Sequence, residues 1–198
     1  GTDPIVGEFA DFPEGTIISN FLGSGVNATI SYAGGTDSND AVITVDTLPP
    51  SVTSLVRADS TPTNADSVHF TVTFSEPVAG IGIDDFVVIT TGDAAGTVAS
   101  VSASVGTSVT VTVNSVSGNG TLAVLFDADL SGGVADETGN VSQNDLLSET
   151  YTIDFTNPTM SVVLVDAELN DADNVSQITF EFSEDVSGFE EDDVAVSG

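Results

Sequence analysis

The chain has 198 residues, in which 31 aspartates and glutamates face a single lysine or arginine, for a formal net charge of −30. Nothing in it could neutralise phosphates, so nucleic acid and anionic membrane surfaces are excluded as partners. The lack of cysteine excludes disulfides and thiolate metal sites. Acids at this density repel one another unless high ionic strength or bound cations intervene, which points to a setting outside the cytoplasm.

The sequence has no apolar run long enough to span a bilayer and no signal peptide, and it begins at Gly1 without a methionine. We therefore expect no membrane insertion in this segment, and we expect the segment to come from a longer chain. Together with the charge, this favours a secreted or cell-surface protein.

Residues 1–46 contain short runs rich in β-branched and aromatic residues, separated by turns of Pro, Gly, Asn and Asp. The runs are residues 5–9, 16–18, 28–32 and 41–45. The last two flank residues 34–40, a Gly- and Asp-containing connection typical of a hairpin. We interpret residues 1–46 as the C-terminal strands of a preceding β-domain.

Two consecutive prolines, Pro49 and Pro50, mark a boundary, because they cannot continue a sheet ladder and they hold the chain extended. A corresponding joint occurs at residues 155–158. Between the joints, apolar residues recur at every second position, as they do from residue 68 to 74 and from 109 to 113. Residues 47–155 are thus expected to form one complete domain whose strands each bury one face.

About seven strands fit between the joints, at residues 52–56, 68–74, 86–89, 98–105, 109–113, 122–126 and 151–153. Their number and the spacing of the turns predict an all-β fold, an immunoglobulin-like β-sandwich repeat. After Pro158 the pattern restarts with runs at residues 160–165, 178–182 and 194–196. Residues 156–198 are therefore expected to be the first strands of a following repeat.

The chain repeats itself at a constant offset, which is the separation between Thr44 and Thr152 and also between Val88 and Val196. Between these two pairs the match holds without a gap. The two most similar stretches are residues 74–86 and 182–194, which both begin with Phe-Ser-Glu and both contain Asp-Asp. The offset is close to the length of an immunoglobulin-type domain, roughly 100 residues. A period of this length predicts a tandem-repeat protein.

Six spaced motifs occur in order along residues 46–198. They are Asp46-Thr47-x-x-Pro50, Phe74-Ser75-Glu76-x-Val78-x-Gly80, Asp85-Phe86, Ser117-Gly118-Asn119-Gly120-Thr121, Asp136-x-x-Gly139-Asn140 and Tyr151-Thr152-Ile153-Asp154. On these motifs the chain resembles the bacterial immunoglobulin-like tandem repeats of large secreted, calcium-dependent adhesins and repetitive surface proteins. The resemblance implies calcium binding near domain joints and implies no catalytic activity. At the second joint, Phe155 and Asn157 replace the small residues that are commoner in the family.

Acidic residues are expected to gather at one pole of the sandwich, because the start of its first strand, the loop between its second and third strands and the loop between its sixth and seventh strands all lie there. Crowded carboxylates repel one another unless a cation lies between them, and calcium takes about six to eight oxygen ligands in flexible geometry. We therefore predict structural Ca²⁺ binding. The candidate ligands are Asp46, Glu76, Asp85, Asp127, Asp129 and Asp136 and, toward the next repeat, Asp154, Glu184 and Asp193. The alternative is that these acids form a solvated surface that binds no metal. Against that alternative, Asp46 and Glu76 recur in the second copy whereas Asp59 does not.

Enzymatic activity is not expected. His69, the single histidine, lies between core positions of a strand and is expected to point outward, and there is no tryptophan to wall a sugar-binding cleft. The sequence favours a calcium-stiffened spacer repeat of an adhesin or surface filament that contacts neighbouring repeats of the same chain. Two alternatives stay open. One is a glycan- or ligand-binding β-sandwich module that meets host or surface glycans, and the other is a surface-layer or fibre subunit that like subunits complete by strand complementation.

Overall fold

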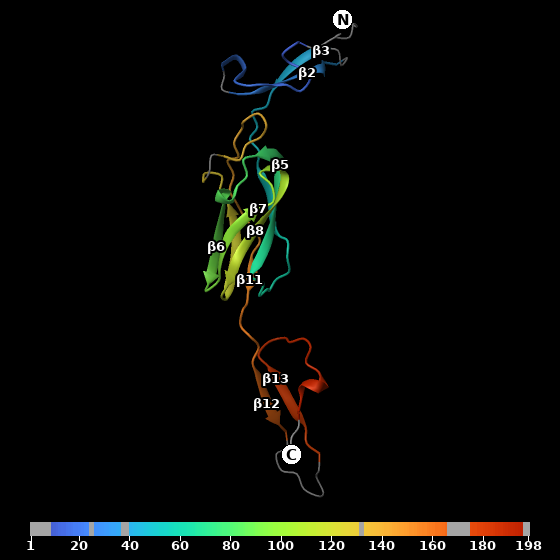
Figure 1. Ribbon diagram of the computed structural model, residues 1–198, viewed down its shortest axis with the longest axis vertical. Coiled ribbons are helices and arrows are strands. Elements are labelled where there is room, and N and C mark those ends of the chain that lie inside the picture. The colour runs from blue at the N-terminus through green and yellow to red at the C-terminus, as the bar shows by residue number, and fades with distance from the viewer. Residues whose placement is uncertain (1–8, 24–25, 37–39, 131–132, 166–174, 196–198) are drawn as a thin grey trace. The chain divides into compact units, whose positions relative to one another are not determined.

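Figure 1 shows the computed structural model of the chain, which describes residues 9–23, 26–36, 40–130, 133–165 and 175–195. The chain divides into two compact units, residues 1–155 and residues 156–198. The predicted run at residues 5–9 lies outside the described residues except for Phe9. No helix in the described ranges is long and apolar enough to cross a membrane.

Residues 52–153 form two antiparallel sheets. One has the strand order β4-β5-β8-β7, and these strands span Val52–Arg57, Ser67–Ala79, Val105–Ser117 and Ala95–Val101 respectively. In the other, the central strand β9 (Gly120–Phe126) pairs with β6 (Phe86–Gly92), with β10 (Leu146–Leu147) and with β11 (Tyr151–Ile153). This is the strand order of a constant-type immunoglobulin sandwich, so the predicted all-β fold class is confirmed.

The core lies between these two sheets, because alternate residues of each strand point inward. Phe70 and Val72 of β5 and Leu122 of β9 are completely buried. The ring of Phe70 stands edge-on to that of Tyr151 in β11, with the ring centroids 5.1 Å apart. Such edge-to-face pairs add about 0.5–1.5 kcal/mol beyond the burial of their surface, so this contact helps to hold the last strand onto the first sheet.

The predicted strand at residues 98–105 is wrong in its second half. β7 ends at Val101 and β8 begins at Val105, and the chain reverses between them. The Ser102 amide donates a hydrogen bond of 2.9 Å to the Thr110 carbonyl oxygen just after β7 ends. Apolar side chains continue at every second position from Val101 to Val105, so the periodicity gave no sign of the turn.

A smaller sheet precedes the sandwich, with the strand order β1-β2-β3. Its strands span Ile17–Ile18, Ala28–Gly34 and Asp40–Val45, close to three of the predicted runs. The structure places this sheet in the same compact unit as the sandwich. The assignment of residues 1–46 to a separate preceding domain therefore stays a prediction.

In the second unit, β12 (Met160–Leu164) pairs with β13 (Ile178–Phe182), and the 3-10 turn η3 spans Glu191–Asp193. These elements are the counterparts, at the repeat offset, of β4, β5 and the turn η2 (Ile83–Asp85), so the repeat seen in the sequence is also a structural repeat. The predicted strand at residues 194–196 does not form at Val194 and Ala195, and its last residue lies outside the described ranges.

Candidate metal site

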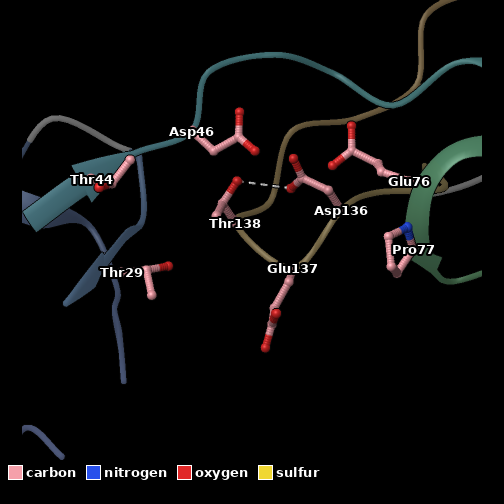
Figure 2. Close-up of a pocket in the computed structure, with 8 residues that line it drawn as sticks. All are labelled: Thr29, Thr44, Asp46, Glu76, Pro77, Asp136, Glu137 and Thr138. Atoms are coloured by element: carbon pink, nitrogen blue, oxygen red, sulfur yellow. Dashed lines mark hydrogen bonds between the residues drawn. The ribbon is translucent and has the colours of Figure 1, made fainter. Parts of the chain in front are cut away.

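Three carboxylates from separate elements of the first unit converge in a groove (Figure 2). Asp46 lies between β3 and β4, Glu76 lies near the end of β5, and Asp136 lies in the long connection from β9 to β10. One carboxylate oxygen from each lies within 4.8 Å of those of the other two. The structure thus brings together three of the nine predicted ligands.

A short backbone bridge brings Asp136 to Glu76. Ala79, at the end of β5, donates to the Ala135 carbonyl oxygen at 2.8 Å, and the Ala135 amide donates back to Ala79 at 3.0 Å. Gly80 then turns the chain with φ +90°, and a Cβ there would lie 3.1 Å from the Gly133 carbonyl oxygen. Because Ala135 directly precedes Asp136, this bridge fixes the position from which the aspartate projects.

Asp136 is held rigidly and is only 7% exposed. Its Oδ1 accepts hydrogen bonds from the Asn140 amide at 2.8 Å and from the Thr138 hydroxyl at 3.0 Å, and its Oδ2 accepts one from the Asn140 side chain at 2.7 Å. Burial acts to raise the pKa of Asp136, but the hydrogen bonds from Asn140, Thr138 and Gly139 outweigh it and hold the pKa below its usual value. Asp136 is therefore ionised, and these hydrogen bonds fix the orientation of its carboxylate.

Asp46 is joined to the same network. The Asn140 side chain donates a hydrogen bond of 3.0 Å to the Asp46 carbonyl oxygen, while the Asp46 Oδ1 accepts a 3.0 Å bond from the Leu48 amide. The first bond holds the connection from β3 to β4 against the β9–β10 connection. The second is the local turn geometry expected of an aspartate ahead of Pro49 and Pro50.

The pKa of Glu76 is shifted in the opposite direction from that of Asp136. Burial first, and then repulsion from Asp136 and Asp46, raise the pKa of Glu76 above its usual value. The glutamate is partly exposed, so solvent screens some of this repulsion. A cation placed among the three carboxylates would remove the repulsion and favour the ionised form of Glu76.

The carboxylate oxygens lie close enough together to share one calcium ion. Two ligand oxygens on opposite sides of a Ca²⁺ ion are separated by at most twice the metal–oxygen distance, about 4.6–5.2 Å. One oxygen from each of the three carboxylates lies within 4.8 Å of those of the other two. Three carboxylates supply about three to six of the oxygens that calcium takes, and water can supply the others.

The groove around the carboxylates has a volume of about 290 Å³. Thr29 of β2 and Thr44 of β3 line it together with Pro77 and Glu137, so the N-terminal sheet contributes to its wall. Figure 2 shows the Glu137 side chain directed away from Asp136 and its two acidic neighbours. Glu137 is therefore a nearby acidic residue that does not belong to the cluster of three carboxylates.

The Asp-Asp part of the repeated motif has a structural use in both copies. The Asp85 carboxylate is 2% exposed and accepts a 2.7 Å hydrogen bond from the Gly82 amide at the start of η2. In the second unit, the Asp193 carboxylate accepts the equivalent bond from the Glu190 amide at 3.0 Å. This shared turn accounts for the recurrence of both aspartates without a metal. Their role as ligands stays a prediction.

The remaining predicted ligands lie outside the cluster of three. Asp127 and Asp129 follow β9, where the Asp127 carboxylate accepts a 3.0 Å bond from the Asp129 amide. The Asp154 amide donates to the Thr63 carbonyl oxygen at 3.0 Å, after the end of β11. Glu184 is exposed in the second unit. The part of these acids in metal binding also stays a prediction.

Sequence reasoning did not assign a role to Asn140 or Thr138. Asn140 contacts both Asp46 and Asp136, so it organises the cluster without being acidic. The signal was available in the motif Asp136-x-x-Gly139-Asn140, which places the amide one turn after the aspartate. Because Asn140 is not acidic, the positions of the carboxylates alone do not point to it.

A family model described as a bacterial Ig-like domain matches residues 154–198. No curated protein matches the chain, and no solved structure does. The matched segment contains β12, β13 and η3, whose counterparts one repeat earlier begin the complete sandwich. Domains of this kind are typical of extracellular or surface proteins. The resemblance stated from the sequence is thus confirmed, since residues 154–198 match the bacterial Ig-like domain family and residues 52–153 fold as an immunoglobulin-like sandwich.

Proposed function

We propose that the chain is a non-enzymatic immunoglobulin-like spacer of a secreted adhesin or surface filament, stiffened by a structural calcium ion. The convergence of Asp46, Glu76 and Asp136 within 4.8 Å carries the proposal. A buried, ionised Asp136 beside a Glu76 whose pKa is raised is an arrangement that a divalent cation would stabilise.

Stiffening follows from where the ligands come from. Asp46 belongs to the connection that leads from β3 into the sandwich, whereas Glu76 and Asp136 belong to the sandwich itself. An ion shared by all three would cross-link the connection to the sandwich and restrict its movement. At free calcium about ten to a hundred times the dissociation constant, binding adds about 1.4–2.7 kcal/mol to the stability of the folded state.

The setting of this spacer follows from its charge and its family. A net charge of −30 suits a surface exposed to salt and millimolar calcium, where both screen the repulsion between acids. The neighbours of the sandwich in such a protein are further repeats of the same chain. The match of residues 154–198 to the bacterial Ig-like domain supports this view.

Calorimetric unfolding in calcium and in chelator tests the proposal. The wild-type melting temperature should rise by about 5–10 °C in saturating calcium, from the stabilisation above and the size of the domain. Glu76→Gln should lose most of this shift, because it removes one ligand. In chelator the same variant should melt slightly above the wild type, because it also removes two repulsive contacts.

Glu137→Gln is the matched control, since it makes the same change in the same groove outside the cluster. It should keep the calcium shift. Asp93→Asn, an exposed acid in the turn between β6 and β7, provides a second control at a distance from the groove. A wild-type melting temperature that calcium leaves unchanged would contradict the proposal, as would equal calcium shifts in the Glu76→Gln and Glu137→Gln variants.

Stiffening needs its own measurement, because an ion can stabilise a domain without restraining the connection. Hydrogen exchange of the backbone amides of Asp46, Thr47, Leu48 and Ser51 should slow in calcium relative to chelator, since Pro49 and Pro50 carry no amide hydrogen. Glu76→Gln should abolish this difference while Glu137→Gln keeps it. Unchanged exchange in this connection, with a raised melting temperature, would leave calcium binding intact and refute the stiffening.

A further inference from the structure

β6 is an outer strand of its sheet, and it lacks the features that usually block such strands. Its seven residues pair with β9 on one side without a register shift. On its other side no strand pairs with it in the described part of the chain, and Figure 1 shows β6 at the side of the sandwich. Residues 86–92 include no charged residue and no proline. Natural proteins use charges, prolines and bulges to keep outer strands from pairing with further strands, so β6 is open to such pairing.

The other outer strands of the sandwich are covered or irregular. The Glu149 amide covers β4 by donating a hydrogen bond of 3.3 Å to the Leu55 carbonyl oxygen. The Thr63 amide covers β11 by donating one of 3.0 Å to the Thr152 carbonyl oxygen. β7 is interrupted by two register shifts. Of these edges, the edge of β6 is both regular and uncovered.

The hydrogen bonds of the β6–β9 ladder show which backbone groups of β6 face its open side. The Asp127 amide donates to the Asp85 carbonyl oxygen at 3.0 Å, so these two opposed residues bond across the ladder. In an antiparallel pair, bonded residues alternate with residues whose amide and carbonyl groups point away from the partner. Val88 and Thr90 are residues of the second kind, and Val124, which lies opposite Val88, bonds on the far side of β9. Val88 and Thr90 thus present donors and acceptors to an added strand.

An apolar groove of about 480 Å³ lies at this open side, between β6 and β7. Val88 of β6 and Val98 of β7 line it, and both also pack against the core of the sandwich. Ile83, which lines it too, is 45% exposed. A strand hydrogen-bonded to β6 would direct every second side chain over this groove, where apolar side chains would cover the seam between the two sheets.

The charges around β6 indicate what kind of strand fits. Asp84 lines the groove just before β6, Asp93 follows the end of β6, and both are exposed. The strand between them is uncharged. A segment with a lysine or arginine near each end and apolar residues between them therefore complements this edge.

A second copy of this chain does not have that chemistry. Two β6 strands paired along their length, in either direction, would bring Asp84 or Asp93 of one copy close to an aspartate of the other. The chain has one lysine or arginine in all, Arg57, and it lies 3.5 Å from Glu149 and over the Tyr151 ring. The fitting partner is therefore a different, basic polypeptide.

We propose that β6 binds an extended basic segment of another protein, which adds to the sheet as a further strand and places its apolar side chains in the groove. Main-chain hydrogen bonds to Val88 and Thr90 supply affinity, and the groove selects the side chains. Every residue of this site lies within the sandwich of residues 52–153. The proposal goes beyond the spacer role and does not depend on the metal site.

Fluorescence anisotropy of a labelled synthetic peptide tests the proposal, with the full chain, chelator and about 0.15 M salt, where the Debye length is about 8 Å. The peptide has lysine at both ends and alternating valine and threonine between them. A second peptide keeps the lysines but has serine in place of valine, and it should bind about tenfold more weakly or worse. Equal binding of the two would mean that the formal charge of −30 alone attracts them, and would overturn the proposal.

Hydrogen exchange locates the bound peptide. Saturation with the valine peptide should slow exchange of the Val88 and Thr90 amides, which face the open side, and leave the Val87 and Ile89 amides, which already bond to β9, unchanged. Thr90→Pro removes one donor on the open side without breaking a ladder bond, so the folded variant should lose most of the binding. Unchanged exchange at Val88 and Thr90 with the peptide bound would overturn strand addition at β6.

Asp84→Lys should weaken binding of the valine peptide about two- to fivefold, because it replaces an attraction by a repulsion at an exposed site. Asp185→Lys is the matched control, since it makes the same change at an exposed acid of the second unit. Circular dichroism and the melting temperature establish that each variant folds. Equal weakening in both variants would overturn the placement of the site. So would a dimer of the free chain by light scattering that Thr90→Pro abolishes, because β6 would then receive a second copy.

Discussion

The Tyr151 hydroxyl donates a hydrogen bond of 2.7 Å to the His69 carbonyl oxygen, which joins the last strand of one sheet to β5 of the other. The Asp59 amide donates to the same hydroxyl at 2.9 Å, and the Asp59 carboxylate lies 3.0 Å from the His69 Nδ1. The His69 side chain is 40% exposed, as expected from its position between core residues. Arg57 lies over the Tyr151 ring at 5.6 Å, so Arg57 and His69, the only arginine and histidine of the chain, both flank Tyr151.

Tyr151→Phe should destabilise the sandwich by about 1–3 kcal/mol, because it leaves the Asp59 amide and the His69 carbonyl without their shared partner. Urea unfolding measures the change. Tyr32→Phe removes a hydroxyl that bonds to Phe12 in the N-terminal sheet, and it should leave the sandwich transition unchanged. Equal midpoints for Tyr151→Phe and the wild type would show that the hydroxyl contributes nothing to closing the domain.

Calcium affinity should fall as the pH is lowered toward 5. The pKa of Glu76 is raised, so in the absence of metal its protonated form is favoured in the folded state, and stability falls as pH rises from the unfolded pKa through the folded pKa. A calcium ion bound by Glu76 would have to displace this proton. Isothermal titration between pH 5 and pH 7.5 should show the change, with protons released on binding, and a pH-independent affinity would contradict it.

Glu76→Gln separates the contribution of Glu76 from that of Asp136. The pKa of Asp136 lies below its usual value, so Asp136 stays ionised across this range and its stabilisation is lost only as pH falls through that lowered pKa. The weakened binding that remains in Glu76→Gln should therefore vary little between pH 5 and pH 7.5. A variant that keeps the full pH dependence would place the titrating group elsewhere.

Gly80→Ala should destabilise the sandwich more than Gly188→Ala destabilises the second unit. The two glycines are equivalent in the repeat and have φ of +90° and +81°, so a side chain costs about 1–2 kcal/mol of backbone strain at either. At Gly80 a Cβ would also meet the Gly133 carbonyl oxygen at 3.1 Å, whereas at Gly188 it would meet no described atom within 4 Å. Thermal unfolding of the two variants compares the effects.

The same Gly80→Ala change should weaken calcium binding, because it disturbs the Ala79–Ala135 bridge that places Asp136. Titration calorimetry should show a loss of affinity in Gly80→Ala and none in Gly188→Ala. Unchanged affinity in both would mean that the bridge does not position the aspartate.

Asp85→Ala should cost about 1–2 kcal/mol with or without calcium, since the carboxylate accepts the Gly82 amide at the start of η2. Burial is the main cause that raises the pKa of Asp85, in keeping with a side chain enclosed by the fold. The melting temperature in chelator measures the loss. If Asp85→Ala instead lost the calcium shift while melting normally in chelator, Asp85 would be a ligand.

The repeat and the alternation of apolar residues determined the architecture from the sequence. Apolar residues at every second position over Val68–Phe74 can be buried together only on one face of a strand. A constant repeat offset without gaps predicts corresponding strands in both copies, and β4–β5 and β12–β13 do correspond. The turn before Val105 was not predicted, because apolar residues continue to alternate with polar ones through it.

The sequence by itself also narrowed the metal candidates to nine acids, but only the tertiary structure divided them. Asp85 and Glu76 belong to one repeated motif, and local sequence treats them alike. Folding buries Asp85 under its own turn, while the Ala79–Ala135 bridge brings Asp136 from a distant part of the chain to Glu76. Which carboxylates meet is decided by long-range backbone pairing and burial, and neither is encoded in the spacing of the acids.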